Sequence, residues 1–160
     1  MKNRDHSYFM EKALKQAELA LKKGEVPVGA VVVGPKGNIL ARGHNLVELK
    51  GCQTAHAEMS ALTKACKKRG NWRLDDCFLY VTLEPCVMCF GFIALSRVKG
   101  LVFGAKSPLF GGSQFLGSLE ATAVKMGDHV TIIQGLKEVE SAAILKLFFK
   151  QARQKNKGDI

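Results

Sequence analysis

Four residues in two short strings carry the side chains that could hold and use a zinc ion. His56 and Glu58 stand two residues apart, and Cys86 and Cys89 stand three apart directly after a proline. Catalytic zinc takes three protein ligands of the imidazole, thiolate or carboxylate kind and keeps a fourth position for water. We therefore predict that His56, Cys86 and Cys89 bind one zinc ion per chain and that Glu58 is the catalytic residue that moves protons.

Both strings are predicted to stand at helix starts. Cys86 and Cys89 then fall on one face of a first helical turn, where the N-terminal end of the helix favours the thiolate form. Glu58 cannot share the direction of His56 on its helix, yet it can reach the open side of the metal. Glu58 is therefore predicted to be a proton carrier and not a ligand.

Each feature also has an ordinary interpretation. A Cys-x-x-Cys string by itself fits a redox pair, a single histidine is usually a satisfied polar residue, and a glutamate in a first helical turn complements the helix dipole. A closed structural site is a more serious alternative, because Cys52 lies four residues before His56 and could complete a tetrahedron of three cysteines and one histidine. Structural sites usually draw their ligands as two closely spaced pairs, which favours the three-ligand site.

Alternating helix and strand patterns would position these residues. Apolar side chains recur at helical spacing from Phe9 to Leu21, whereas β-branched runs bounded by turn residues indicate strands. The expected elements are helix 7–23 with Ser7 as its cap, a hairpin of strands 26–33 and 39–42, a polar loop, helix 54–69, strand 77–82, helix 86–95, strand 101–103, a glycine-rich loop 104–117, a short helix, strand 130–133 and a helix from 138. Strand, helix and strand over 77–103 fit a parallel crossover, so we predict an α/β fold with a mixed sheet and helices on both of its faces.

Length and composition limit the classes of protein. At 160 residues the chain is predicted to form a single domain, 1–160, with a basic tail from about residue 151. The formal net charge of +10 suits a polyanionic partner, although a basic protein can also simply be soluble. Five cysteines, an odd number without a secretory signal before them, indicate a reducing cytoplasm. No apolar run approaches the roughly 20 residues that span a bilayer, so we expect no membrane role.

Several longer strings carry a family resemblance. They are Glu25-Val26-Pro27-Val28-Gly29-Ala30, His44-Asn45, Thr54-Ala55-His56-Ala57-Glu58, Asn71-Trp72-Arg73-Leu74, Leu79-Tyr80-Val81-Thr82-Leu83-Glu84-Pro85-Cys86-Val87-Met88-Cys89, Ser96-Arg97 and Val102-Phe103-Gly104-Ala105. With these strings the chain resembles the zinc-dependent cytidine and adenosine deaminases, and most closely the bacterial tRNA adenosine deaminases that convert the wobble adenosine to inosine. The likeness covers residues 8–105 and is weaker in the final helix.

The resemblance implies a fold and a substrate pocket. The implied fold is a three-layer α/β/α cytidine-deaminase-like fold around a mixed five-stranded sheet. In the implied pocket Asn45 hydrogen-bonds the purine, the backbone of Ala57 helps to fix the edge of the base, and Val28 lies against the base. A loop asparagine often caps a neighbouring turn instead, and that alternative for Asn45 stays open.

A tRNA anticodon stem-loop is the partner that the resemblance implies. The family uses the region after Ala105 against that loop, which makes Lys106 a candidate RNA contact. Positive charge recurs along the final helix, around and after the Phe148-Phe149 pair. Phe149, Lys150 and Arg153 are therefore further candidates. The alternative for this second group is a solvated, fraying helix end.

A homodimer is expected from the family and from the helix 86–95. Apolar side chains surround more of that helix than one core face needs, and they are Phe90, Phe92, Ile93 and Leu95. A helix packed between the sheet and the last helix would explain the same composition.

Two strings depart from the family pattern. The family usually has proline just before Thr54, where this chain has Cys52 and Gln53. After Ala105 the family carries an acidic segment, whereas residues 106–113 read Lys-Ser-Pro-Leu-Phe-Gly-Gly-Ser. The first departure concerns the entry to the metal helix, and the second concerns the RNA contacts more than the chemistry.

We therefore expect a hydrolase that deaminates adenosine to inosine at the tRNA wobble position by a zinc-activated water. Two other functions stay open. One is a zinc deaminase of a free base or nucleoside, such as guanine or cytidine, and the other is a non-catalytic RNA-binding module stabilised by zinc.

Overall fold

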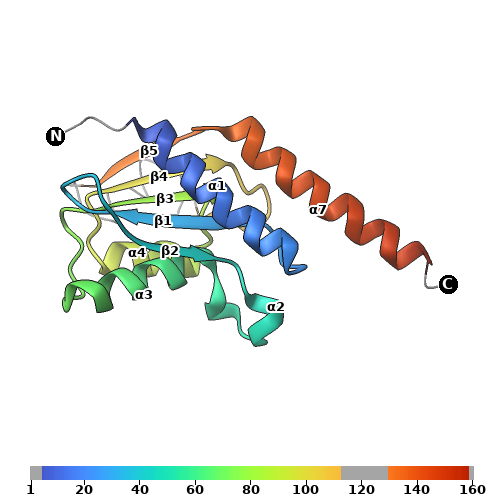
Figure 1. Cartoon of the computed structure of the whole chain (residues 1–160), viewed down its shortest axis with the longest axis horizontal. Coiled ribbons are helices and arrows are strands. Elements are labelled where there is room, and N and C mark those ends of the chain that lie inside the picture. Colours follow the sequence, from blue (N-terminus) through green and yellow to red (C-terminus); the bar gives the residue numbers. More distant parts are fainter. Residues whose placement is uncertain (1–4, 113–129, 159–160) are drawn as a thin grey trace.

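Within the residues that the computed structural model describes, 5–112 and 130–158, five strands form one sheet in the order β2-β1-β3-β4-β5 (Figure 1). The strands are β1 (Gly29–Val33), β2 (Ile39–His44), β3 (Phe78–Leu83), β4 (Gly100–Ala105) and β5 (Thr131–Gln134). β1 runs antiparallel to β2 and β3, whereas β3, β4 and β5 run parallel to one another. The predicted mixed five-stranded sheet is confirmed.

Helices cover both faces of this sheet. The helices of the described residues are α1 (His6–Lys22), α2 (Val47–Lys50), α3 (Ala57–Arg69), α4 (Val87–Leu95) and α7 (Glu138–Gly158), with a 3-10 turn η1 (Gln53–Ala55) before α3. Figure 1 shows α1 and α7 over one face and α3 and α4 over the other, so the predicted three-layer α/β/α fold is confirmed. The predicted cap of α1 was wrong, because the carboxylate of Asp5 caps the helix and accepts the amide of Ser7 at 3.3 Å.

The interior strand β1 lies between the two helical layers. All of its residues are buried, as expected for a strand that is covered on both faces. Val31 and Val33 pack with Phe9 of α1, whereas Ala30 and Val32 pack into the core that α3 and α4 share. This alternation follows from the two-residue period of a strand.

Two strand boundaries differ from the prediction. The strand expected over 26–33 begins only at Gly29, because the amide of Val28 donates to the carbonyl of Val26 at 2.8 Å and closes a tight turn. The strand expected over 101–103 is longer and ends at Ala105. The glycine-rich loop therefore starts two residues later than predicted.

The helix expected from Thr54 starts at Ala57. Gln53–Ala55 form η1 instead, and His56 has an extended backbone, with φ −62° and ψ 154°, as the residue that precedes α3. The polar loop expected before it contains α2. These differences matter because they decide the direction in which the His56 side chain points.

The C-terminal elements agree with the sequence pattern. β5 and α7 stand where a strand over 130–133 and a helix from 138 were expected. The end of the predicted glycine-rich loop and the short helix after it lie outside the described residues. Among the helices that are described, none combines the length and the apolar character that crossing a bilayer requires.

Candidate active site

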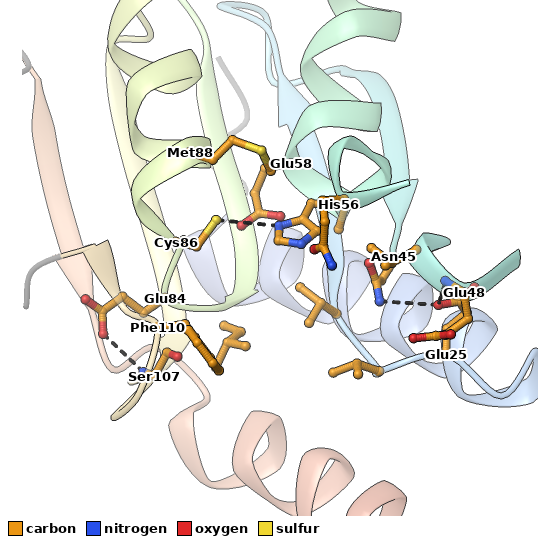
Figure 2. A pocket seen from close by; sticks show the side chains of 16 residues that line it. Glu25, Asn45, Glu48, His56, Glu58, Glu84, Cys86, Met88, Ser107 and Phe110 are labelled. Carbon is orange, nitrogen blue, oxygen red and sulfur yellow. Dashed lines mark hydrogen bonds between the residues drawn. The ribbon is translucent and has the colours of Figure 1, made fainter. Parts of the chain in front are cut away.

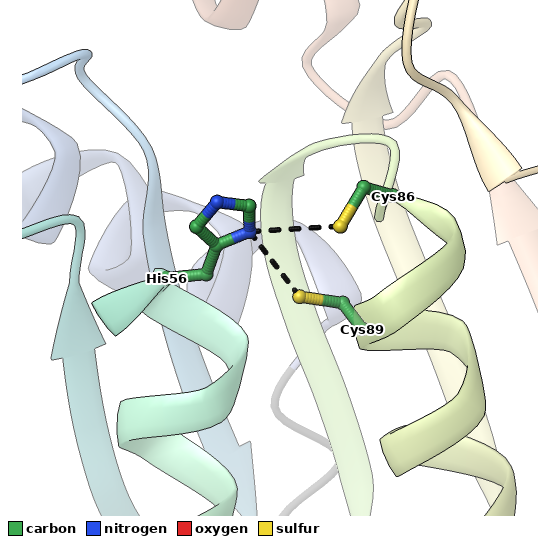
Figure 3. A group of neighbouring side chains, drawn as sticks. All are labelled: His56, Cys86 and Cys89. Atoms are coloured by element: carbon green, nitrogen blue, oxygen red, sulfur yellow. Dashed lines mark hydrogen bonds between the residues drawn. The ribbon is translucent and has the colours of Figure 1, made fainter. Parts of the chain in front are cut away.

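The three predicted metal ligands come together where α3 and α4 begin. His56 directly precedes α3, Cys86 directly precedes α4, and Cys89 lies in the first turn of α4. The Nδ1 atom of His56 lies 3.6 Å from the sulfur of Cys86 and 3.5 Å from the sulfur of Cys89 (Figure 3). The ligand atoms of the three residues all lie within 4.8 Å of one another.

Local backbone geometry explains this meeting. His56 and Cys86 both have extended backbones, with ψ values of 154° and 168°, so their side chains stand beside the helix starts. Gly43 of β2 lets α3 approach the sheet, because a Cβ at that position would overlap the carbonyl oxygen of Ala57. A larger residue at position 43 would displace the start of α3, and His56 with it, from the two cysteines.

The electrostatics of the cluster favour a bound cation. Hydrogen bonds from Cys89 and His56 hold the pKa of the Cys86 thiol well below its usual range. The hydrogen-bond contact between His56 and Cys86 raises the pKa of His56. The contact between Cys89 and Cys86, together with burial, raises the pKa of Cys89. A thiolate, a second cysteine sulfur and an imidazole nitrogen this close together form a donor set that zinc prefers. These residues therefore fit a zinc ion.

Cys52 is not part of this cluster. Its side chain is exposed, and its sulfur lies 3.1 Å from the hydroxyl oxygen of Thr54. Among the described residues, the group of potential ligands around His56 contains Cys86 and Cys89 and no other histidine, cysteine or acidic residue. This geometry favours the three-ligand catalytic site over the closed structural site.

Glu58 lies beside the ligands in the first turn of α3. Its side chain is only 4% exposed, and burial raises its pKa to about 7. Figure 2 shows Glu58 next to His56 and Cys86 at the cavity wall. A carboxyl group with a pKa near neutrality can both take up and release a proton, as acid–base chemistry requires.

A cavity of about 540 Å³ opens in front of this cluster. Such a volume lies within the range of small-molecule sites. The three residues predicted to bind the substrate all line it, and they are Val28, Asn45 and Ala57. The remaining lining residues are Glu25, Val26, Val47, Glu48, Gln53, His56, Glu58, Leu83, Glu84, Cys86, Met88, Ser107 and Phe110.

Glu25 is a buried carboxylate in the cavity wall for which no role was predicted from the sequence. Its side chain is 1% exposed and accepts the backbone amides of Glu48 at 3.1 Å and Leu49 at 2.7 Å. It also accepts the side-chain amide of Asn45 at 3.5 Å. Glu25 thus caps the short helix α2 and ties Asn45 to it. Both interpretations of Asn45, a hydrogen bond to the purine and a turn cap, stay predictions beside this contact.

The four predicted RNA contacts lie at two places. Lys106 is exposed and stands next to Ser107, which lines the cavity. Phe149, Lys150 and Arg153 are exposed on α7, and none of them lines the cavity. Figure 1 shows that the C-terminal half of α7 extends past the sheet.

Fold and site together are those of a zinc-binding deaminase domain. Residues 3–105 match the family described as the cytidine and deoxycytidylate deaminase zinc-binding region, and the chain belongs to this family. The chain is also 45% identical over 149 residues to a tRNA-specific adenosine deaminase of Bacillus subtilis, covering 93% of this chain and 91% of that one. A tRNA-specific adenosine deaminase of Streptococcus pyogenes serotype M18 is 42% identical, with 96% and 95% covered. The predicted resemblance is confirmed.

Two solved structures are similar to this chain over most of its length. One comes from a study of A-to-I editing by tRNA deaminases at the wobble position of transfer RNA. It superposes with a TM-score of 0.77 at 37% identity, covering 87% of this chain and 99% of that one. A guanine deaminase from Nitrosomonas europaea superposes with a TM-score of 0.78 at 27% identity, with 90% and 84% covered.

Proposed function

We propose that this chain hydrolyses the exocyclic amine of adenosine at the wobble position of a tRNA, giving inosine and ammonia. The observation that carries the proposal is a buried carboxyl, Glu58, beside a zinc-type ligand set at the wall of a cavity of about 540 Å³. Adenosine in tRNA is favoured as the substrate because relatives with 42% and 45% identity over most of the chain are tRNA-specific adenosine deaminases.

The residues divide the work of the reaction among them. Zinc held by His56, Cys86 and Cys89 would lower the pKa of a water molecule toward neutrality. Glu58 takes one proton from the attacking water and passes it to the ring nitrogen beside the reacting carbon. It then takes the second proton from the hydroxyl group now on that carbon and gives it to the amine, so that the carbon–nitrogen bond breaks, ammonia leaves and a carbonyl remains. Asn45, held by Glu25, hydrogen-bonds the purine.

The shape of the cavity supports this orientation of the base. Val28 and the backbone of Ala57 line the same cavity and would fix the face and the edge of the base. The target base has to leave its stack to reach them, which costs least in a single-stranded loop. An anticodon loop meets that requirement.

Inosine formation on total tRNA tests the proposal. We expect the purified, zinc-loaded protein to convert adenosine to inosine at the wobble position, detected by nuclease digestion and chromatography. Total tRNA that gains no inosine would reject the substrate. A deaminase of free guanine is the second candidate, which the superposition on the guanine deaminase favours. Ammonia release from free bases and nucleosides identifies that activity.

We also propose that the reaction takes place in the cytoplasm. The five cysteines are all free, as a reducing compartment would keep them. Three of the five are not available for disulfides: Cys77 is buried, and Cys86 and Cys89 belong to the predicted metal site.

The exposed cations of α7 are proposed as contacts to tRNA phosphates. Replacing Lys150 and Arg153 together by alanine should weaken binding of an anticodon stem-loop and flatten its salt dependence. Two lost phosphate contacts correspond to a change of about 1.4 in the slope of log affinity against log salt, at roughly 0.7 per phosphate of a single strand. Fluorescence anisotropy over a salt series measures both quantities.

The matched control is the double variant Lys67→Ala and Lys68→Ala. These lysines are also exposed, but they stand in the last turn of α3, at the end of that helix away from the metal ligands. We expect the control to keep nearly the native slope. A tail variant with the same slope as the control would exclude the α7 contacts.

A homodimer is proposed on the outer face of α4. Phe90 and Ile93 turn out to be buried in the core and Phe92 is partly buried, so they explain less of the expected interface than their composition suggested. Val87 and Leu95 remain 46% and 75% exposed, eight residues apart on one side of the helix. A second copy of the chain would cover this apolar stripe.

Leu95→Glu is therefore expected to convert the dimer to a monomer at micromolar concentration, because the charge would be buried in the interface. Light scattering gives the mass directly. Val139→Glu is the control, since Val139 is 79% exposed on α7, away from α4. A native protein that is already a monomer, or a Leu95→Glu variant that stays a dimer, would reject this interface.

A further inference from the structure

A large aromatic side chain stands exposed at the edge of the substrate cavity. Phe110 is 69% exposed and lines the cavity. Its neighbour Leu109 is 75% exposed and does not line it. Figure 2 shows Phe110 on the side of the cavity opposite Asn45 and Glu25. An aromatic ring exposed at the edge of a cavity is accessible to a ligand that enters the cavity, and covering the ring with that ligand is favourable.

The loop that carries Phe110 is tied to the metal site. The amide of Ser107 donates to the carboxylate of Glu84 at 3.1 Å, and the amide of Gly112 donates to the carbonyl of Pro85 at 2.8 Å. Gly111 forms an isolated β-bridge with Cys86, one of the predicted zinc ligands. Phe110 therefore lies within a segment whose two ends are both anchored to the residues that lead into α4.

Glycine at position 111 makes this close approach possible. A Cβ there would stand 2.5 Å from a carboxylate oxygen of Glu84, closer than real Cβ contacts allow. The loop is consequently seated directly on the turn before Cys86, which fixes the backbone of Phe110 relative to the predicted zinc ligands. An anchored backbone lowers the entropy that is lost when the ring binds.

We infer that Phe110 stacks on a nucleobase that adjoins the target adenosine in the RNA. This inference rests on the proposed function. When the target base swings into the cavity, its neighbours in the strand lose a stacking partner, and an aromatic ring at the cavity edge can replace it. Such stacking tolerates any base, because every base presents a π face.

The first test compares single variants on an anticodon stem-loop that has adenosine at the wobble position. Phe110→Ala should lower kcat/KM by about 5- to 150-fold, the range that loss of one base–aromatic stack produces. Phe110→Trp should keep near-native kcat/KM, because the ring is retained. Leu109→Ala is the matched control, and we expect it to match the native protein. Native kcat/KM in Phe110→Ala would overturn the inference.

The second test asks which group Phe110 contacts. Two stem-loops are prepared, one without the base on the 5′ side of the target and one without the base on the 3′ side. For each, kcat/KM of the native protein and of Phe110→Ala is compared with the values on the intact stem-loop, as a double-mutant cycle. We expect the loss caused by Phe110→Ala to disappear on one of these two RNAs. The same loss on both abasic RNAs, or an equal loss on free adenosine, would overturn the inference and place the ring against the target base or the backbone.

Different outcomes reject the proposed substrate and the stacking role of Phe110. A native protein that does not deaminate the intact stem-loop rejects the proposed substrate and this inference with it. A native protein that deaminates the stem-loop, with Phe110→Ala equally active, rejects the stacking role alone.

Discussion

Replacement of Glu58 by glutamine is expected to lower turnover by about 10²- to 10⁴-fold, the contribution typical of a positioned acid–base group. Glutamine keeps the size of the side chain and therefore the shape of the cavity, but it cannot take up a proton from water or deliver one to the leaving amine. Glu58 lies outside the ligand group, so the variant should keep its zinc. Single-turnover deamination and zinc determination by atomic absorption measure the two quantities on one sample.

The matched control for this variant is Glu18→Gln. Glu18 is exposed on α1, on the opposite side of the sheet from α3, so the same chemical change there should leave turnover and zinc content unaltered. Native turnover in Glu58→Gln would exclude the proton-carrying role. Loss of zinc together with turnover would mean that Glu58 supports the metal instead.

Part of the predicted ligand group could be anticipated, because two of its members stand close together in the sequence. The spacing of Cys86 and Cys89 places both sulfurs at the first turn of a helix, whatever the rest of the chain does. The meeting with His56 also requires that α3 and α4 begin beside each other, and the spacing within the two strings does not report this.

The predicted start of α3, at Thr54, was wrong for a physical reason. Thr54 has the side chain of a good helix cap, and local preference therefore favours a helix from that point. The chain instead makes the turn η1 and leaves His56 extended before α3. Packing of α3 against Gly43 of β2 involves residues that are distant in sequence, and no local pattern reports it.

The role of Glu25 was hidden for the same reason. Its backbone partners belong to Glu48 and Leu49, and its side-chain partner is Asn45, all of which follow it by 20 residues or more. The helix α2 that it caps has four residues, too few to show a helical hydrophobic period. One signal was available, because a charged residue between the end of α1 and a buried strand needs partners if it is to be buried.

Removal of one metal ligand is the other change for which we expect a large effect. Cys86→Ser should lower zinc affinity by more than about 100-fold, because even changes to groups that only support a ligand cost 10- to 100-fold. Each chain should bind one zinc ion before the change and almost none after it at equal free zinc. Turnover should fall with zinc occupancy, and the rise in melting temperature that added zinc gives the native protein should disappear, since a ligand stabilises only the state that binds it.

Cys52→Ser is the control that separates a three-ligand site from a closed one. The sulfur of Cys52 faces the hydroxyl of Thr54 and lies outside the ligand group, so serine at position 52 should leave zinc affinity, the zinc-dependent rise in melting temperature and turnover at native values. A closed structural site of three cysteines and one histidine would behave differently, because the serine variant would then lose zinc as Cys86→Ser does. Equal zinc loss in the two variants would therefore exclude the open catalytic position on which deamination depends.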